Sequence, residues 1–257
     1  MVKPPVNHVQ AYTPCIALRP FVRRILIVES AVAHHDSHLH ETGFVGVFRF
    51  RGSCQLDHQR EAPQSAITGL WDTVRSHQHS EDCASAIVSF TSTGAAALLR
   101  QPLDELANAT MPLNELLPRS ASLHTLSERL AEASDYAHRF QTIEQELLRN
   151  LDLSRQDQQI VEAIARLEGS ETPVYIEVLA RQLGLSQSAL ERRFRKVVGT
   201  TPRRFASLIR LKRVLQYRES GLDMTALAYA AGYYDQSHFI KDFQSFAGCA
   251  PTAYFNA

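Results

Sequence analysis

The sequence predicts an α+β fold, in which a mostly-β amino-terminal domain with helices at its carboxyl end precedes an all-α domain. Three observations predict it. The segment Phe44–Arg51 alternates aromatic and other residues, as a half-buried strand does. Apolar residues recur at helical spacing from Ser120 to Leu153, and a helical pattern occurs twice between Pro173 and Pro251. A length of 257 residues favours two domains, which we expect at 1–153 and 154–257.

The duplicated pattern predicts two helix-turn-helix units, at about 173–199 and 222–248. In each copy, apolar residues at i, i+3, i+4 and i+7 precede a glycine, a second apolar stripe and a Gly-x-x-Pro ending. The matching residues have the same spacing in both copies except in the turn, where the second copy is longer by a single position. The matching residues are Ile176, Leu179, Ala180, Leu183, Gly184, Leu190, Phe194 and Val197, then Met224, Leu227, Ala228, Ala231, Gly232, Phe239, Phe243 and Phe246.

Local signals mark where these helices begin. A glycine just past a short helix adopts positive φ and turns the chain. Ser186 and Asp235 are the predicted N-caps of the second helix of each unit, which we call its recognition helix. Between the units, Thr201 caps and Pro202 begins a connecting helix of roughly four turns, with its apolar stripe at Phe205–Leu215.

The charge of this region predicts double-stranded DNA as the partner. Ten residues between Glu191 and Arg218 are Lys or Arg, and Glu191 is the only acid there, although the whole chain has zero formal net charge. A solvated helix surface usually mixes the signs, whereas one-signed charge on a helix-turn-helix is typical of phosphate contacts. The alternative is a helical protein-interaction module with a basic surface.

The residues of the two units form a specific motif. They are Leu183, Ser186, Ser188, Leu190, Arg192, Phe194, Gly199, Thr201 and Pro202, then Ala228, Gly232, Tyr233, Asp235, Gln236, Ser237, His238, Phe239, Lys241, Asp242, Phe243, Phe246, Gly248 and Pro251. This motif resembles the AraC-type (AraC/XylS) transcription regulators. The resemblance implies a monomeric domain whose two units read successive major grooves on one DNA face, and hence a sequence-specific regulator of transcription.

The segment Ala86–Leu116 resembles the sensor half of one AraC-type subgroup, in which a strand precedes a short helix and a P-x-x-E-L-x-N element. The resemblance implies a sensor or dimerisation domain at 1–153 and leaves its small-molecule effector unidentified. The residues that carry it are Val88, Ser89, Phe90, Gly94, Ala95, Leu98, Leu99, Pro102, Glu105, Leu106, Asn108 and Leu113.

DNA contacts are expected on the exposed faces of the recognition helices. Arg192 is the best candidate for a base contact, because its planar fork matches guanine O6 and N7. Glu191 either accepts from cytosine N4 or pairs with Arg195 at i+4. Asp242 departs from the basic pattern often seen in the family, which predicts a smaller contribution from the second unit, with Gln236 and His238 structural in that case. The predicted set is Gln187, Ser188, Glu191 and Arg192, with Arg195, Lys196, Arg203 and Arg204 on phosphates, and Gln236, Ser237, His238 and Lys241 in the second unit.

The chain is predicted to be mostly β from its start to about position 110. Strands are expected over Phe21–Glu29, Phe44–Arg51, Ile67–Val74 and Ala86–Phe90, after an irregular start rich in proline at Met1–Pro20. Their spacing suggests a small sheet or partly closed barrel, which could enclose a small molecule.

Eight of the eleven histidines lie between the start of the chain and His79. His38 and His40 are two apart, as are His77 and His79, so on a strand each pair would share one face. Such pairs would suit a metal-sensing regulator. The alternative is a set of polar loop histidines beside turns. Because no cysteine or carboxylate stands at a recognisable ligand spacing, we expect neither a metal nor a cofactor.

The chain is predicted to be helical from Ser120 to Leu153, as two helices or one bent helix. Its apolar stripes fit either the domain core or the seam of a homodimer, since AraC-type sensor halves often pair through such helices; we favour the seam slightly. Ser154 with Asp157 resembles the start of a helix that Gly169 ends. The stripes are Leu123, Leu126, Leu130 and Ala133, then Phe140, Ile143, Leu147, Leu148 and Leu151.

The remaining observations concern the class of protein. Nucleophile-elbow, phosphate-loop, dinucleotide-binding and zinc-protease motifs are absent from the sequence, so we expect no enzyme. Cys15, Cys54 and Cys83 are too dispersed for the metal-bound cysteine of the alkyl-transfer modules fused to some AraC-type domains. All four cysteines are expected to be thiols. No apolar run approaches the roughly 18 residues of a membrane span, and no signal pattern begins the chain. We expect a cytoplasmic regulator that contacts RNA polymerase if it activates.

Overall fold

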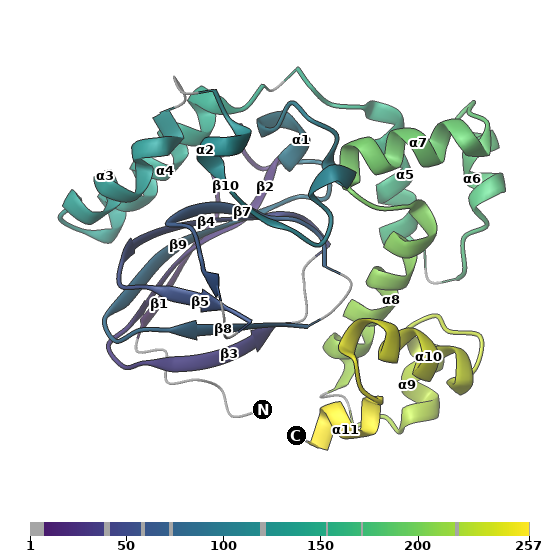
Figure 1. Cartoon of the computed structure of the whole chain (residues 1–257). Coiled ribbons are helices and arrows are strands. Elements are labelled where there is room, and N and C mark those ends of the chain that lie inside the picture. Colours follow the sequence, from purple (N-terminus) through teal and green to yellow (C-terminus); the bar gives the residue numbers. More distant parts are fainter. Residues whose placement is uncertain are drawn as a thin grey trace.

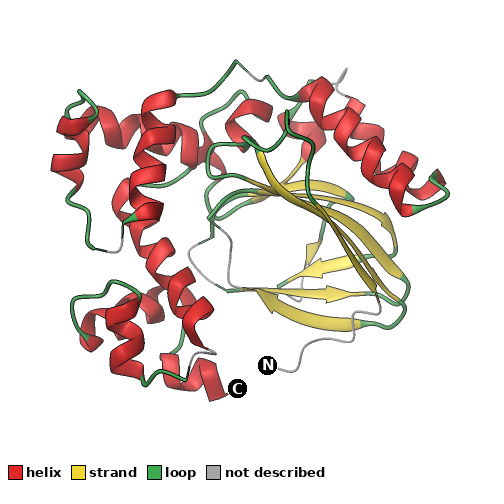
Figure 2. Cartoon of the chain, turned by 180° about the vertical axis from the view of Figure 1, so that it is seen from behind, coloured by secondary structure: helices red, strands yellow, loops and turns green. Residues whose placement is uncertain are grey.

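The computed structural model describes residues 8–38, 42–57, 60–71, 74–118, 122–152, 154–170, 172–218 and 221–256. Its amino-terminal half is built on two antiparallel sheets, and its carboxyl-terminal half consists of helices (Figure 1). Figure 2 shows the same division from behind, with the strands gathered on one side of the molecule and the helices of the repeat on the other. The predicted α+β class is therefore confirmed.

The larger sheet has six strands. Their order is β1 (His8–Tyr12), β2 (Val22–Ser30), β9 (Cys83–Phe90), β4 (Val45–Arg51), β7 (Ser65–Thr68) and β10 (Thr110–Pro112). The alternation in β4 has the predicted effect, because Phe48 and Phe50 are buried on one face while Val45 and Val47 are half-buried on the other. Arg49 is buried as well, and its guanidinium donates to the carbonyl of Ala62 at 2.7 Å.

The smaller sheet has four strands, in the order β3 (His34–His38), β8 (Arg75–His79), β5 (Cys54–Leu56) and β6 (Arg60–Glu61). The sequence analysis missed these strands: β3 and β8 are rich in His and Ser and lack apolar alternation, and β5 and β6 have only three and two residues. Placing these histidines in loops was therefore wrong. Their strands pair directly, with His34 opposite His79 across the ladder.

Two other expectations about strands need correction. The predicted strand Ile67–Val74 is observed as Ser65–Thr68, so it begins two residues earlier and ends at Thr68. The start of the chain is less irregular than expected, since β1 pairs with β2.

Helices cover the outer face of the larger sheet (Figure 1). They are α1 (Ala95–Leu98), η1 (Leu103–Leu106), α2 (Leu113–Leu116), η2 (Ser122–Thr125), α3 (Leu126–Glu132) and α4 (Tyr136–Asn150). The described part of the region predicted to be helical, residues 122–152, thus contains two α-helices rather than one bent helix. Glu146 of α4 is fully buried and accepts hydrogen bonds from Arg129 of α3 and from Arg149, which ties these helices together.

The apolar stripes of α3 and α4 do not form the exposed seam that we favoured. All but one of their side chains are buried within this chain, against the sheet and each other, so they belong to the domain core. The exception is Leu148, which is 39% exposed. The covered residues are Leu123, Leu126, Leu130, Ala133, Phe140, Ile143, Leu147 and Leu151.

The carboxyl-terminal half confirms the repeat. Its helices are α5 (Gln158–Gly169), α6 (Ile176–Gln182), α7 (Gln187–Val198), α8 (Pro202–Tyr217), α9 (Met224–Ala230), α10 (Gln236–Ala247) and α11 (Pro251–Asn256). Helices α6 and α9 begin at matching positions of the repeat, as do the recognition helices α7 and α10, and the extra position of the second copy lies in its turn, as predicted. The N-cap of α5 is Asp157, which accepts from the N–H of Ile160 at 3.3 Å, whereas Ser154 bonds Asp152 instead; that expectation was wrong.

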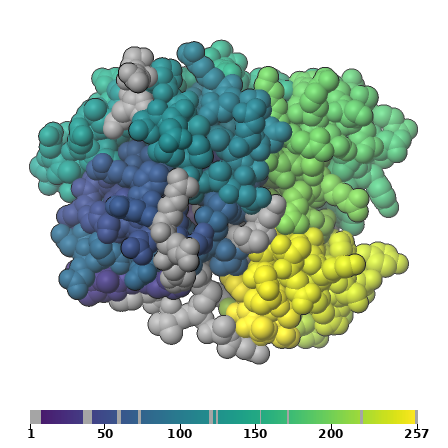
Figure 3. Space-filling model, viewed as in Figure 1, coloured from purple at the N-terminus to yellow at the C-terminus, as the bar shows by residue number. Residues whose placement is uncertain are grey.

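The hydrophobic core is continuous across the predicted boundary at 153/154. One cluster of buried residues runs from the larger sheet through α5, α6 and α7 to the first half of α8, whereas the second unit has a separate core around Phe239 and Phe243. Figure 3 shows the green first unit abutting the amino-terminal half. The two-domain division therefore stays a prediction, and the first unit shares its core with the sheet.

Candidate nucleic-acid interface

The two recognition helices are built in the same way. The side chain of Ser186 accepts from the N–H of Ala189 at 3.2 Å, and that of Asp235 accepts from the N–H of His238 at 2.7 Å. These caps satisfy backbone donors that have no partner within the helix. Both predicted N-caps are therefore confirmed, as is the start of α8 at Thr201, which accepts from Arg204 N–H at 3.1 Å.

Apolar residues hold one face of each recognition helix in the protein. Leu190, Phe194 and Val198 of α7 are buried, and Phe239, Phe243 and Phe246 of α10 are buried in the corresponding positions. The opposite faces remain polar and exposed, as helical periodicity requires. Part of each recognition helix is therefore exposed to solvent.

The amino-terminal half of α7 presents the predicted first-unit residues to solvent. Gln187, Ser188 and Arg192 are exposed or half-exposed, and Arg192 makes no hydrogen bond or ion pair with any residue that the structure describes. Glu191 accepts from the amide of Gln187 at 2.9 Å and lies 3.5 Å from the guanidinium of Arg195. Of the two roles considered for Glu191, the pairing with Arg195 is thus present in the free protein.

The phosphate candidates at the flank of α7 differ from one another. Lys196 and Arg203 are exposed and have no hydrogen-bond or ionic partner among the described residues. The guanidinium of Arg204 instead lies 3.6 Å from the centre of the Phe246 ring and donates to the hydroxyl of Ser245 at 3.1 Å. Arg204 therefore joins α8 to the second unit, whatever it does with DNA.

Several other basic residues of the one-signed run hold the fold together. Arg193 makes a two-point ion pair with Asp157, with nitrogen–oxygen distances of 2.5 and 2.8 Å. Arg213 donates to the carbonyl of Glu168 at 2.8 Å, and Arg218 donates to that of Phe255 at 2.5 Å. The charge count in the sequence therefore overstates the area of basic surface, because the count cannot separate a paired arginine from an exposed one.

The exposed face of the second recognition helix is polar. Gln236, Ser237, His238 and Lys241 lie on its solvent side, half-exposed or exposed. Asp242 points inward, where its carboxylate lies 3.4 Å from the guanidinium of Arg210 and only 14% of its side chain is exposed.

A buried hydroxyl completes this inward-facing group. The Arg210 guanidinium lies 5.1 Å from the ring centre of Tyr233. Burial, with the nearby charge of Asp242, raises the pKa of the Tyr233 hydroxyl. Asp242 is therefore a structural ion-pair partner of α8 and does not lie on the exposed face of α10.

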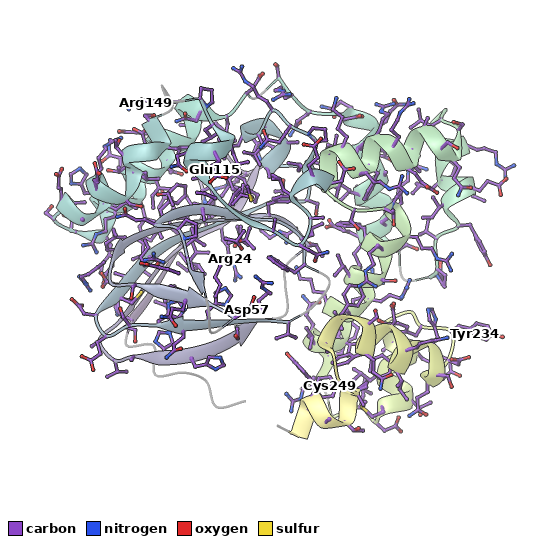
Figure 4. The ribbon with its side chains drawn as sticks, viewed as in Figure 1. Arg24, Asp57, Glu115, Arg149, Tyr234 and Cys249 are labelled. Carbon is purple, nitrogen blue, oxygen red and sulfur yellow. The ribbon has the colours of Figure 1, made fainter. Side chains whose placement is uncertain are left out.

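Tyr234 is a surface residue that the sequence analysis did not single out. It precedes the N-cap of α10, is 81% exposed and projects away from the body of the protein (Figure 4). The residue directly before it, Tyr233, is also a tyrosine but is only 3% exposed. The signal that could have separated the two was the helix-turn-helix register, which assigns Tyr233 to the core and Tyr234 to the turn surface.

The carboxyl-terminal end of α7 packs against the amino-terminal half. Gly199 ends the helix with φ 86°, and a Cβ placed there would lie 3.0 Å from the Phe44 ring and 3.1 Å from the carbonyl oxygen of Leu103. The first recognition helix therefore has one end free for a ligand and the other fixed on the β-sheet domain.

The histidines of the smaller sheet lie close together. The rings of His34 and His79 stack with centroids 4.6 Å apart, and Nδ1 of His79 lies 3.7 Å from Sγ of Cys83. Within the residues described, no three His, Cys, Asp or Glu side chains are arranged to hold a metal ion. His40 lies outside the described residues, so the predicted pair with His38 is not seen.

Two further properties bear on the class of protein. All four cysteines are free, with Cys54 and Cys83 buried and the other two half-buried, as expected of thiols. Among the helices that the structure describes, none combines the length and apolar character needed to cross a membrane.

Comparison with known proteins gives matches to both halves of the chain. Residues 179–257 match the family described as a helix-turn-helix domain, and residues 10–112 match a domain of unknown function (DUF6597). An uncharacterized HTH-type transcriptional regulator of Haemophilus influenzae is 29% identical over 92 residues, which are 35% of this chain and 31% of that protein. The regulatory protein Ada of Salmonella typhimurium is 32% identical over 93 residues, which are 35% and 26% of the two proteins.

A solved structure resembles the chain over a greater length. ToxT from Vibrio cholerae is 12% identical, covering 96% of this chain and 98% of that chain with a TM-score of 0.46. The matches to the two curated relatives, by contrast, span about a third or less of those proteins.

Proposed function

We propose that this chain, which joins a segment matching DUF6597 to a segment matching a helix-turn-helix domain, is an AraC-type regulator that binds double-stranded DNA in a sequence-specific way to regulate transcription. The two recognition helices enter successive major grooves. One observation carries the proposal, namely two capped helices of matching construction whose outward faces are polar and exposed. A protein-interaction module would have no need of the unpaired cations on these faces.

We assign base contacts to the solvent-facing side chains at the amino-terminal halves of both helices. Arg192 is central, because it has no competing partner in the described part of the chain. Gln187, Ser188 and Glu191 accompany it in the first unit. Gln236, Ser237, His238 and Lys241 form the equivalent set in the second, where Asp242 is turned inward.

We assign phosphate contacts to the cations at the flanks. Arg195, Lys196 and Arg203 are exposed and lie at or beyond the middle of α7. Arg204 is the weakest of the predicted set, because a phosphate would compete with its contacts to Phe246 and Ser245.

The amino-terminal domain would report a signal to the first unit. The continuous core that joins the β-sheets to α7 supports this role, because a change in the sheet domain would alter the support of that helix. A small-molecule effector, a second copy of the chain, RNA polymerase contact and a cytoplasmic location belong to the same proposal. The second copy would have to use a surface other than the covered stripes of α3 and α4.

The test uses the full chain, since the first unit shares its core with the amino-terminal domain. Duplex fragments bound from a random pool would be selected, and affinity for the enriched site measured across salt concentrations. Four phosphate contacts predict a slope of log affinity against log salt of about −3.6. The control variant Arg181→Ala, on the exposed face of α6 and paired with Glu177, should keep the affinity within about twofold. Binding that is absent, or insensitive to salt, would favour the protein-interaction module.

A further inference from the structure

A groove separates the amino-terminal domain from the first helix-turn-helix unit. Its volume is about 520 Å³, within the range of small-molecule sites. Three parts of the chain line it: the segment after α1 with Arg100 and Gln101, the segment that leads into α5, and the carboxyl-terminal half of α7 with Lys196 and Val197. Its walls therefore belong to both halves of the molecule.

The groove is strongly cationic. Four of its lining residues are Arg or Lys, and Asp157 is the only acid among them. Asp157 is already engaged by Arg193 through two nitrogen–oxygen contacts and by the N–H of Ile160 as a helix cap. The charges of Arg100, Arg155 and Lys196 are therefore not offset by a carboxylate in the lining.

These three cations are available to a ligand. In the part of the chain that the structure describes, Arg100 and Lys196 have neither a hydrogen bond nor an ion pair. Arg155 uses one guanidinium nitrogen to donate to the carbonyl of Leu99 at 3.1 Å, which leaves its other donors free. The neighbouring acid Asp152 lies outside the groove lining; its pKa is lowered by its hydrogen bonds to Ser154 and by the charges of Arg155 and Arg100.

The rest of the lining combines glutamine residues with apolar residues. Gln101, Gln156 and Gln158 line the groove, as do Ala96, Leu99 and Val197. Gln159 also lines it, but its amide already donates to the carbonyl of Leu183 at 2.7 Å and accepts from Arg193 at 2.5 Å. Amides recognise hydroxyl groups, and guanidinium groups bind phosphate oxygens in pairs. A monocarboxylate would leave most of the positive charge uncompensated, whereas a phosphate monoester carries close to two negative charges at neutral pH.

We propose that this groove binds a small phosphate monoester with a hydroxylated organic part, held by Arg100, Arg155 and Lys196. Because Arg100 belongs to the amino-terminal domain and Lys196 to the recognition helix α7, the bound phosphate bridges the two. The ligand thereby changes how α7 is held. Binding in the groove stands independently of the proposed function, but its effect on DNA affinity rests on that function.

The experiment is a calorimetric titration of the full chain with glycerol 3-phosphate at fixed ionic strength, with inorganic phosphate and glycerol as comparison probes. Glycerol 3-phosphate should bind, inorganic phosphate should bind more weakly, and glycerol should not bind. The variants Arg100→Gln and Lys196→Gln should each weaken the binding at least about tenfold, since each removes a charge-assisted hydrogen bond. The charge-matched control Arg181→Gln, whose side chain pairs with Glu177 and which does not line the groove, should bind as the natural chain does.

Three outcomes would overturn the inference: no binding of either phosphate probe, equal binding by all variants, or an equal loss in the Arg181→Gln control. DNA binding is measured separately on Arg100→Gln, because Lys196 is itself a candidate DNA contact. If that variant loses DNA affinity without any probe present, the groove serves the DNA backbone and not a small molecule. If the natural chain binds the phosphate probe but does not bind DNA, the proposed function is refuted and the assignment of the groove stands.

Discussion

Replacing Gly199 by alanine tests whether the β-sheet domain supports the first recognition helix. Gly199 and Gly248 end α7 and α10 at equivalent positions of the repeat, with φ of 86° and 71°. An L-residue in this left-handed region costs about 1–2 kcal/mol. No atom of the described residues lies within 4 Å of a Cβ built on Gly248, so Gly248→Ala should cost only that amount.

The same substitution at Gly199 adds a steric term. Its Cβ would lie 3.0 Å from the Phe44 ring and 3.1 Å from the carbonyl of Leu103. Phe44 is 1% exposed and the other neighbour is backbone, so neither moves freely. Overpacking of this kind costs about 1–3 kcal/mol. Gly199→Ala should therefore destabilise the chain by about 2–5 kcal/mol in total.

Urea unfolding of the full chain measures both variants. Far-ultraviolet circular dichroism follows the helices, and the fluorescence of Trp71, the only tryptophan, follows the amino-terminal domain, in which it is buried. Gly199→Ala should lower the midpoint of both signals. Gly248→Ala should act on the second core and leave the Trp71 transition almost unchanged. Equal shifts of the Trp71 transition in the two variants would refute the continuous core that joins the sheet to α7.

Three further predictions follow from single side chains. Arg192→Ala should weaken binding to the selected DNA site by about 1–3 kcal/mol and relax the sequence preference of the protein. Arg203→Ala should weaken binding to all DNA sequences alike and reduce the slope of log affinity against log salt by about 0.9. Electrophoretic binding assays on matched and mutated sites distinguish these results. Asp242→Asn should lower the melting temperature by leaving Arg210 without its 3.4 Å partner, and a melting temperature equal to that of the natural chain would contradict the inward placement. Burial opposes ionisation of Glu146, but its hydrogen bonds and the nearby arginines lower its pKa overall. The ionised carboxylate therefore stabilises the folded chain above its ordinary pKa, and this stabilisation is lost as the pH falls through the lowered pKa. Glu146→Gln should therefore cost about 1–3 kcal/mol near pH 7, and the difference from the natural chain should shrink below about pH 4.5 in urea titrations.

The candidate interface could be predicted well where the signals are local. The caps at Ser186 and Asp235 were predicted from residue type and position, and the structure confirms both hydrogen bonds. The apolar spacing likewise predicted which face of each helix is buried. Such signals act within one or two turns, so the surrounding fold has little power to change them.

Prediction was weaker where distant segments meet. The histidine-rich strands β3 and β8 have no apolar alternation, and they are strands because they pair with each other and with β5. In the same way, the stripes of α3 and α4 had two consistent interpretations, and only their packing against the sheet distinguished core from dimer seam.

The sequence by itself determined the duplicated helix-turn-helix, its caps and its outward polar face, because helix periodicity and capping depend on near neighbours in the chain. The tertiary structure decided which of the basic side chains are paired within the protein. Arg193 and Arg210 are paired inward while Arg192 has no partner among the described residues, although all three belong to the same basic run. It also decided that the first unit shares a core with the β-sheet domain and the second does not. Both outcomes depend on which residues, far apart in the chain, are brought into contact, and no local pattern encodes that contact.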